Sequence, residues 1–184
     1  RQQWNLPNAI TATRIATIPF FVWALLADGG ESQTWRWVAT VIFAVSASTD
    51  KLDGYLARRR NLVTDLGKLL DPIADKALVG TALVGLSIIG ELWWWVTALI
   101  LVRELGITVM RFFMLRYVVL PASRGGKVKT VLQSAAIIAL LAPTWALPGF
   151  VHVMGVVLMV AAVVVTVVTG VDYLVQAARL RPKR

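Results

Sequence analysis

The sequence predicts an all-α integral membrane protein: a bundle of six transmembrane helices with a polar cavity open to the cytoplasmic side. Of its 184 residues, 58% are hydrophobic, whereas soluble domains contain roughly 45–50%. The mean hydropathy is +0.70. The apolar residues gather in six segments, and a hydrocarbon layer about 30 Å thick is crossed by roughly 20 such residues.

The ends of these segments follow from residues that start or stop helices. Pro7-Asn8 suits the start of the first helix, and Asp28-Gly29-Gly30 ends it. Gly90-Glu91 ends the third helix, and Pro121 lies in the break after the fourth. The predicted helices run from about 8 to 27, 34 to 58, 67 to 89, 92 to 117, 127 to 141 and 148 to 178. Without an internal repeat or linker, residues 1–184 are expected to form a single domain.

The distribution of charge predicts the orientation. The formal net charge is +9, but the basic residues alternate with long apolar runs, which argues against nucleic acid as a partner. With the N-terminus in the cytoplasm, the three outer loops hold Arg36 and almost no other basic residue, as positive-inside topology requires. Both termini are therefore expected to be cytoplasmic. The chain has no cysteine, which excludes disulfides and thiolate metal sites.

Four carboxylates lie near the cytoplasmic ends of the second and third predicted helices. Asp50 and Asp53 share one helix face, and Asp71 and Asp75 share a face of the next helix. The uncharged stretches beyond them cover only about 20 Å at 1.5 Å per residue, so the cluster is expected at headgroup depth. Several ionised carboxylates at such a place are costly unless cations neutralise them. Two divalent ions, Mg²⁺ or Mn²⁺, would balance the charge with oxygen ligands.

The spacing of these residues carries a family resemblance. Asp50-x-x-Asp53-Gly54-x-x-Ala57-Arg58, followed after eight residues by Gly67-x-x-x-Asp71-x-x-x-Asp75, resembles the signature of the CDP-alcohol phosphotransferases. The flanking residues resemble the bacterial phosphatidylglycerophosphate synthase group. These are Asn5 to Asn8 with Thr11 and Arg14, the run from Asp71 to Lys76, Arg103-Glu104, and the run from Gly126 to Thr130.

This resemblance implies an enzyme in the plasma membrane of a bacterium, with an active site that faces the cytoplasm. The enzyme would transfer the phosphatidyl group from CDP-diacylglycerol to sn-glycerol 3-phosphate and release CMP. It implies that Asp75 takes the proton from the attacking hydroxyl. It also implies a homodimer among membrane lipids. The implied metal ligands are Asp50, Asp53, Asp71 and Asp75, and the implied CDP-diacylglycerol-binding residues are Asp50, Asp53, Gly54, Ala57, Arg58 and Gly67.

An acceptor that carries a phosphate needs a basic pocket near the carboxylates. Arg111, Lys127 and Lys129 are the candidates, since the two lysines open the fifth helix, where the helix dipole favours anions. The alternative is that these residues contact anionic lipids. Arg14 is expected either to face the substrate or to extend toward the interface. Arg103 and Glu104 are expected either to serve function or to pair with each other.

Two rival functions remain open from sequence alone. The closer rival is transfer of the phosphatidyl group to inositol phosphate, which also needs a phosphate pocket. The second rival is a divalent-cation transporter, in which the acidic residues would form part of the pathway. Transport would require polar residues through the outer halves of the second and third helices, and these halves are mainly small or apolar.

Overall fold

Six long helices and two short 3₁₀ helices make up almost all of the described chain. The structure is a computed structural model that describes the backbone of residues 6–59, 65–114 and 124–179, and the side chains of residues 8–50, 70–110 and 127–179. The elements are α1 (Leu6–Leu26), η1 (Ala27–Gly30), α2 (Gln33–Arg59), α3 (Asp65–Ile88), α4 (Trp94–Met114), α5 (Arg124–Leu141), η2 (Thr144–Ala146) and α6 (Gly149–Arg179).

All six predicted helices are present, and their ends lie within three residues of the predicted ends. Two of them, at Asn8–Gly30 and Gly149–Arg179, are long and apolar enough to cross a membrane by length and composition. The other four carry more charge. In α2 and α3 these charges include the predicted site carboxylates, and in α4 they include Arg103 and Glu104.

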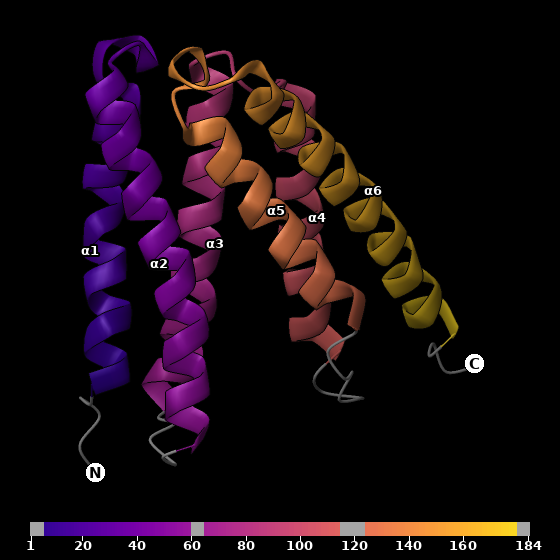
Figure 1. Cartoon of the computed structure of the whole chain (residues 1–184). Coiled ribbons are helices and arrows are strands. Elements are labelled where there is room, and N and C mark those ends of the chain that lie inside the picture. Colours follow the sequence, from indigo (N-terminus) through magenta and orange to yellow (C-terminus); the bar gives the residue numbers. More distant parts are fainter. Residues whose placement is uncertain (1–5, 60–64, 115–123, 180–184) are drawn as a thin grey trace.

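The helices run alternately up and down, so that α1 begins and α6 ends toward the lower end of the molecule (Figure 1). Helix α1 packs against both α2 and α3, and α6 packs mainly against α5. This arrangement places α1 where its side chains can reach the two helices that carry the predicted acidic pairs.

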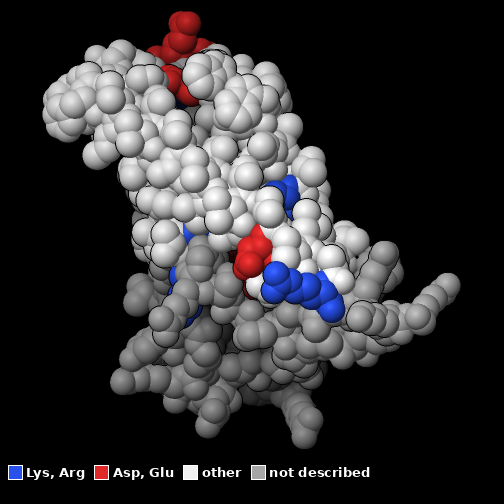
Figure 2. All heavy atoms as spheres, turned by 90° about the vertical axis from the view of Figure 1, so that its right-hand side faces the viewer, with Lys and Arg blue, Asp and Glu red and all other residues white. Residues whose placement is uncertain are grey.

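Large apolar side chains occupy both the interior and the outer surface. Phe21, Phe43, Leu83 and Ile137 are fully buried in one cluster. Many valines and leucines, among them those of α4 and α6, are more than half exposed. Figure 2 shows one long side of the molecule, where uncharged side chains cover most of the surface and acidic and basic side chains meet lower down. Such an extensive exposed apolar surface is typical of a protein that lies in lipid.

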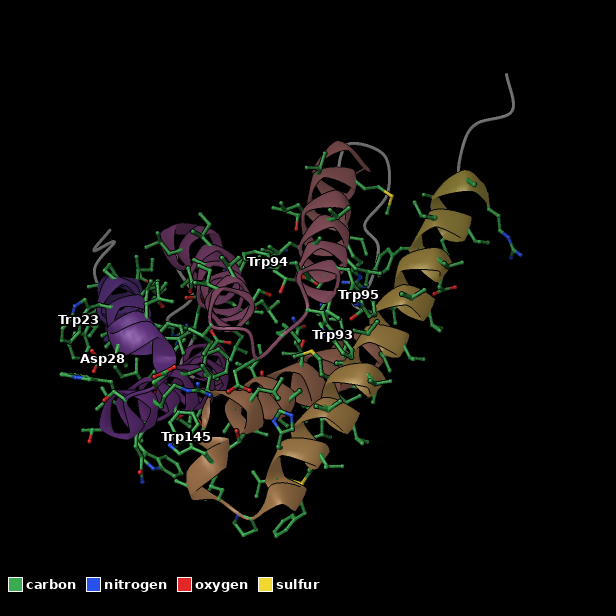
Figure 3. All side chains as sticks on the ribbon, turned by 90° about the horizontal axis from the view of Figure 1, so that it is seen from above. Trp23, Asp28, Trp93, Trp94, Trp95 and Trp145 are labelled. Atoms are coloured by element: carbon green, nitrogen blue, oxygen red, sulfur yellow. The ribbon has the colours of Figure 1, made fainter. Side chains whose placement is uncertain are left out.

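Arg36 holds the upper end of the bundle together. Its side chain is buried and donates to the carbonyl oxygens of Leu141 at 2.8 Å and Leu140 at 2.9 Å, at the end of α5. It also lies 3.3 Å from a carboxylate oxygen of Glu91, between α3 and α4. Its guanidinium sits 5.1 Å from the ring centre of Trp145. The view from this end labels Trp145 together with Trp23, Trp93, Trp94 and Trp95 (Figure 3).

Candidate active site

Three polar residues follow one another at every third position of α1. Asn8, Thr11 and Arg14 are all buried although they lie in an otherwise largely apolar helix. Residues three apart lie on one helix face, so this stripe faces the neighbouring helices. The stripe is therefore the polar side of α1 and lies at the level of the predicted acidic pairs.

The stripe connects the carboxylates of two other helices. Thr11 Oγ1 donates to Asp71 Oδ1 on α3 at 2.6 Å. One turn further along α1, a guanidinium nitrogen of Arg14 donates to Asp50 Oδ1 on α2 at 2.7 Å. The Arg14 side chain is only 3% exposed, whereas that of Asp50 is 35% exposed. A charge-assisted hydrogen bond from a buried arginine fixes the orientation of the carboxylate, which has a second oxygen that can bind a further partner.

Close packing of α1 on α3 makes these contacts possible. A Cβ atom placed on Gly85 would lie 2.5 Å from Leu25 Cδ2, so the Leu25 side chain packs directly on this glycine. Gly85 is on the same helix as Asp71, and Leu25 is on the same helix as Thr11. Gly85 and Leu25 therefore mark a close approach between the two helices that carry Asp71 and Thr11.

Asp75 completes the described part of the acidic cluster. It lies one turn after Asp71 on α3 and within electrostatic range of Asp50, Glu104, Lys129 and Arg14. Asp50 of α2 and Asp75 of α3 thus face the same region from different helices. Among the described side chains, no three acidic or histidine residues form a metal site by themselves. The oxygen-only donor set nevertheless suits hard divalent cations.

A second charged cluster lies beside Asp75 and is centred on Glu104 of α4. The Glu104 carboxylate accepts a hydrogen bond from Arg103 at 2.9 Å and another from Lys129 of α5. Lys76 of α3 lies 3.8 Å from its other oxygen and contacts Thr108. Arg103 also donates to Thr169 of α6 at 2.8 Å. This cluster links α3, α4, α5 and α6, so Arg103 and Glu104 do pair with each other.

A cavity of about 130 Å³ opens between α3, α4 and α5 next to both clusters. Its polar lining residues include Asp75, Lys76, Glu104, Lys129, Gln133 and Ser134. Val79, Gly80, Ile100 and Leu101 form much of its apolar wall. A small polar molecule in this cavity would therefore lie next to the proposed base, Asp75, and to the buried ammonium group of Lys129.

The remaining predicted site residues divide into two groups. Lys127 is exposed at the start of α5, whereas Lys129 is buried and bound to Glu104. The others belong to helices α2, α3 and α4, but their side chains lie outside the described residues. They are Asp53, Gly54, Ala57, Arg58, Gly67 and Arg111.

Sequence reasoning found the carboxylates but not their partners. It left the role of Arg14 open, and it assigned none to Gln133. The signal for the first was the stripe of polar residues along α1, and the signal for the second was a single glutamine in an otherwise apolar part of α5. Neither pattern identifies which carboxylate or cavity the side chain meets.

Comparisons with known proteins all indicate the same family. The sequence profile described as CDP-alcohol phosphatidyltransferase matches residues 4–168. A protein of Mycobacterium tuberculosis named probable phosphatidylglycerophosphate synthase is 50% identical over 175 residues, which cover 95% of this chain and 82% of that protein. Two proteins are named CDP-diacylglycerol–glycerol-3-phosphate 3-phosphatidyltransferase. The one from Bacillus subtilis is 40% identical over 75% of this chain and 77% of its own length. The one from Shigella flexneri serotype 5b is 38% identical over 96% of each.

Proposed function

Because this chain belongs to the CDP-alcohol phosphatidyltransferase family, we propose that it is the enzyme that makes phosphatidylglycerophosphate. It transfers the phosphatidyl group from CDP-diacylglycerol to sn-glycerol 3-phosphate and releases CMP. The observation that carries this proposal is 50% identity over 95% of the chain to a relative of that name. The site supports it, because α1 holds one carboxylate of each predicted acidic pair.

The carboxylates Asp50, Asp53, Asp71 and Asp75 would hold two divalent cations, Mg²⁺ or Mn²⁺. When bound, such ions neutralise the diphosphate and stabilise the charge that develops on the transferred phosphoryl group. The structure supports this assignment through the chemistry of its donors, which are carboxylate oxygens from two adjacent helices. Arg14 and Thr11 would keep Asp50 and Asp71 oriented, as partners of ligand residues commonly do.

Asp75 acts as the general base in this proposal. It accepts the proton from the 1-hydroxyl of glycerol 3-phosphate while that oxygen forms a bond to the phosphorus that carries the diacylglycerol. The bond from this phosphorus to the oxygen of CMP breaks, and CMP leaves with the electron pair. A carboxylate is a weak base at neutral pH, so the placement of Asp75 beside the cavity supports this role.

The substrates would be held by residues on either side of Asp75. Gly54, Ala57, Arg58 and Gly67, together with Asp50 and Asp53, would bind the cytidine diphosphate part of the lipid. The acceptor phosphate would be bound by Arg111 and Lys127. Lys129 would also bind this phosphate while it remains hydrogen-bonded to Glu104, since an ammonium group has three donors.

We place the protein in the plasma membrane of a bacterium, with six crossings and both termini in the cytoplasm. Three observations support this placement: the bacterial relatives, the exposed apolar surface, and the start of α1 and end of α6 at the same end of the bundle. The cavity would then open toward the cytoplasm. A homodimer surrounded by membrane lipids is the proposed assembly.

The test is an assay of the purified protein in lipid nanodiscs. CMP release is measured with CDP-diacylglycerol, Mg²⁺ and one acceptor at a time: glycerol 3-phosphate, inositol phosphate or serine. We expect CMP and phosphatidylglycerophosphate with glycerol 3-phosphate. CMP release with inositol phosphate but not with glycerol 3-phosphate would overturn the proposed acceptor. Uptake of divalent cations into vesicles without any CMP release would overturn the enzyme assignment.

A further inference from the structure

Gln133 is a buried polar residue whose amide nitrogen has no partner among the described residues. Its side chain is 4% exposed, and Nε2 makes no hydrogen bond. A buried donor left in this state costs roughly 1–3 kcal/mol. Nε2 is therefore a buried donor that is available to a molecule bound beside it.

The surroundings of Gln133 indicate which partner fits. It lies one turn after Lys129 on α5, and both residues line the cavity of about 130 Å³ that also includes Asp75. Lys129 is bound to Glu104, so the cavity brings together the proposed base, a buried cation and an unsatisfied amide donor. The amide NH₂ group of glutamine is an uncharged donor, and a hydroxyl oxygen is an uncharged acceptor. A hydroxyl group of a bound molecule is therefore a suitable partner for Gln133 Nε2.

We propose that Gln133 binds the 2-hydroxyl group of the acceptor. The enzyme would then recognise glycerol 3-phosphate by this hydroxyl group as well as by its phosphate. This inference rests on the proposed function. The acceptor would place its 1-hydroxyl at Asp75 and its phosphate toward Lys129, and its middle carbon would then face Gln133. Gln133 is a positioning and specificity residue in this arrangement, and it takes no part in proton transfer.

The test compares two acceptors that differ by one hydroxyl group. The kcat/KM for glycerol 3-phosphate and for 3-hydroxypropyl phosphate, which lacks the 2-hydroxyl, is measured for the wild-type protein and for Gln133→Leu in nanodiscs. The wild-type protein is expected to prefer glycerol 3-phosphate by about tenfold or more. Gln133→Leu should lose most of this preference, because its kcat/KM for glycerol 3-phosphate falls and that for the analogue changes by less than about twofold. The KM for CDP-diacylglycerol should not change.

Gln176→Leu is the matched control, since Gln176 is exposed near the end of α6 and contacts Asp172. Its preference should equal that of the wild-type protein. Equal use of both acceptors by the wild-type protein would overturn the inference, as would an equal loss with both acceptors in Gln133→Leu or no loss at all. If Gln133→Leu does not fold, Gln133→Asn replaces it, and an unchanged preference in that variant would overturn the inference. Absence of CMP release by the wild-type protein with any acceptor would instead contradict the proposed function.

Discussion

Arg14 of α1 and Asp50 of α2 form a partly buried ion pair, with 2.7 Å between a guanidinium nitrogen and Oδ1. The contact joins residues 36 positions apart in sequence. It supplies a cation to the acidic cluster from a helix that carries no acidic residue of its own. The protein therefore neutralises part of the charge of this cluster itself, and it holds one proposed metal ligand, Asp50, by a hydrogen bond.

Replacement of Arg14 should weaken metal binding. In Arg14→Met the Asp50 carboxylate loses its charged partner and its orientation, and loss of such a partner commonly reduces metal affinity about 10–100-fold. The Mg²⁺ concentration that gives half-maximal CMP release should rise by that factor. Arg14→Lys keeps the charge and should show a smaller rise. A half-maximal concentration equal to that of the wild-type protein in Arg14→Met would contradict the role given to this ion pair.

Asp71→Ala should abolish metal-dependent CMP formation and leave the bundle assembled. The carboxylate is a proposed metal ligand, whereas the packing of α1 on α3 rests on apolar contacts that this substitution leaves in place. The assay is CMP release with Mg²⁺ and with Mn²⁺, and the melting temperature from tryptophan fluorescence checks the fold. Thr11→Val is the companion variant, because it removes the donor to Asp71 but keeps the ligand. It should retain part of the activity. An active Asp71→Ala protein would disprove the assignment.

Glu104→Gln should destabilise the protein, because the basic residues that pair with Glu104 lose their negatively charged partner. The Glu104 carboxylate is the shared partner of Arg103, Lys76 and Lys129, and Lys129 is almost fully buried. Breaking a buried pair from one side costs roughly 3–5 kcal/mol, because the other charge is left without compensation. We expect a clear fall in melting temperature. Asp172→Asn is the control at an exposed position on α6 and should melt like the wild-type protein. Equal melting temperatures for both variants would show that the cluster contributes little.

Arg36→Met should lower the stability of the protein without changing its catalysis. Arg36 binds carbonyl oxygens of α5 and the Glu91 carboxylate at the end of the bundle opposite to the start of α1 and the end of α6. Its loss leaves these acceptors without their donor, so the melting temperature should fall strongly. The KM for glycerol 3-phosphate, measured below the new melting temperature, should stay within about twofold, since the site lies at the other end. A large increase in KM with unchanged melting temperature would contradict this division.

Removal of divalent cations should stop the reaction reversibly. EDTA is expected to abolish CMP release, and added Mg²⁺ or Mn²⁺ should restore it, because the carboxylates cannot neutralise the diphosphate themselves. Addition of Ca²⁺ at the same concentration is the informative comparison, since this larger ion takes more ligands and tolerates irregular geometry. Full activity in EDTA would disprove the proposed metal dependence.

The sequence by itself determined the six helices, the acidic pairs and the family. The helices follow from local apolar composition with glycine and proline at the ends, and the acidic pairs follow from three- and four-residue spacing. Both are properties of short stretches of chain, so they can be predicted without knowledge of the packing.

The tertiary structure decided which side chains meet across helices. Arg14 could have faced either the substrate or the interface, and only the position of α1 beside α2 pairs it with Asp50. Glu104 gathers cations from three helices, and Gln133 shares a cavity with Asp75, because α3, α4 and α5 converge there. Such contacts depend on how each helix is rotated about its own axis and how far it lies from its neighbours. The periodicity of a single helix specifies neither of these.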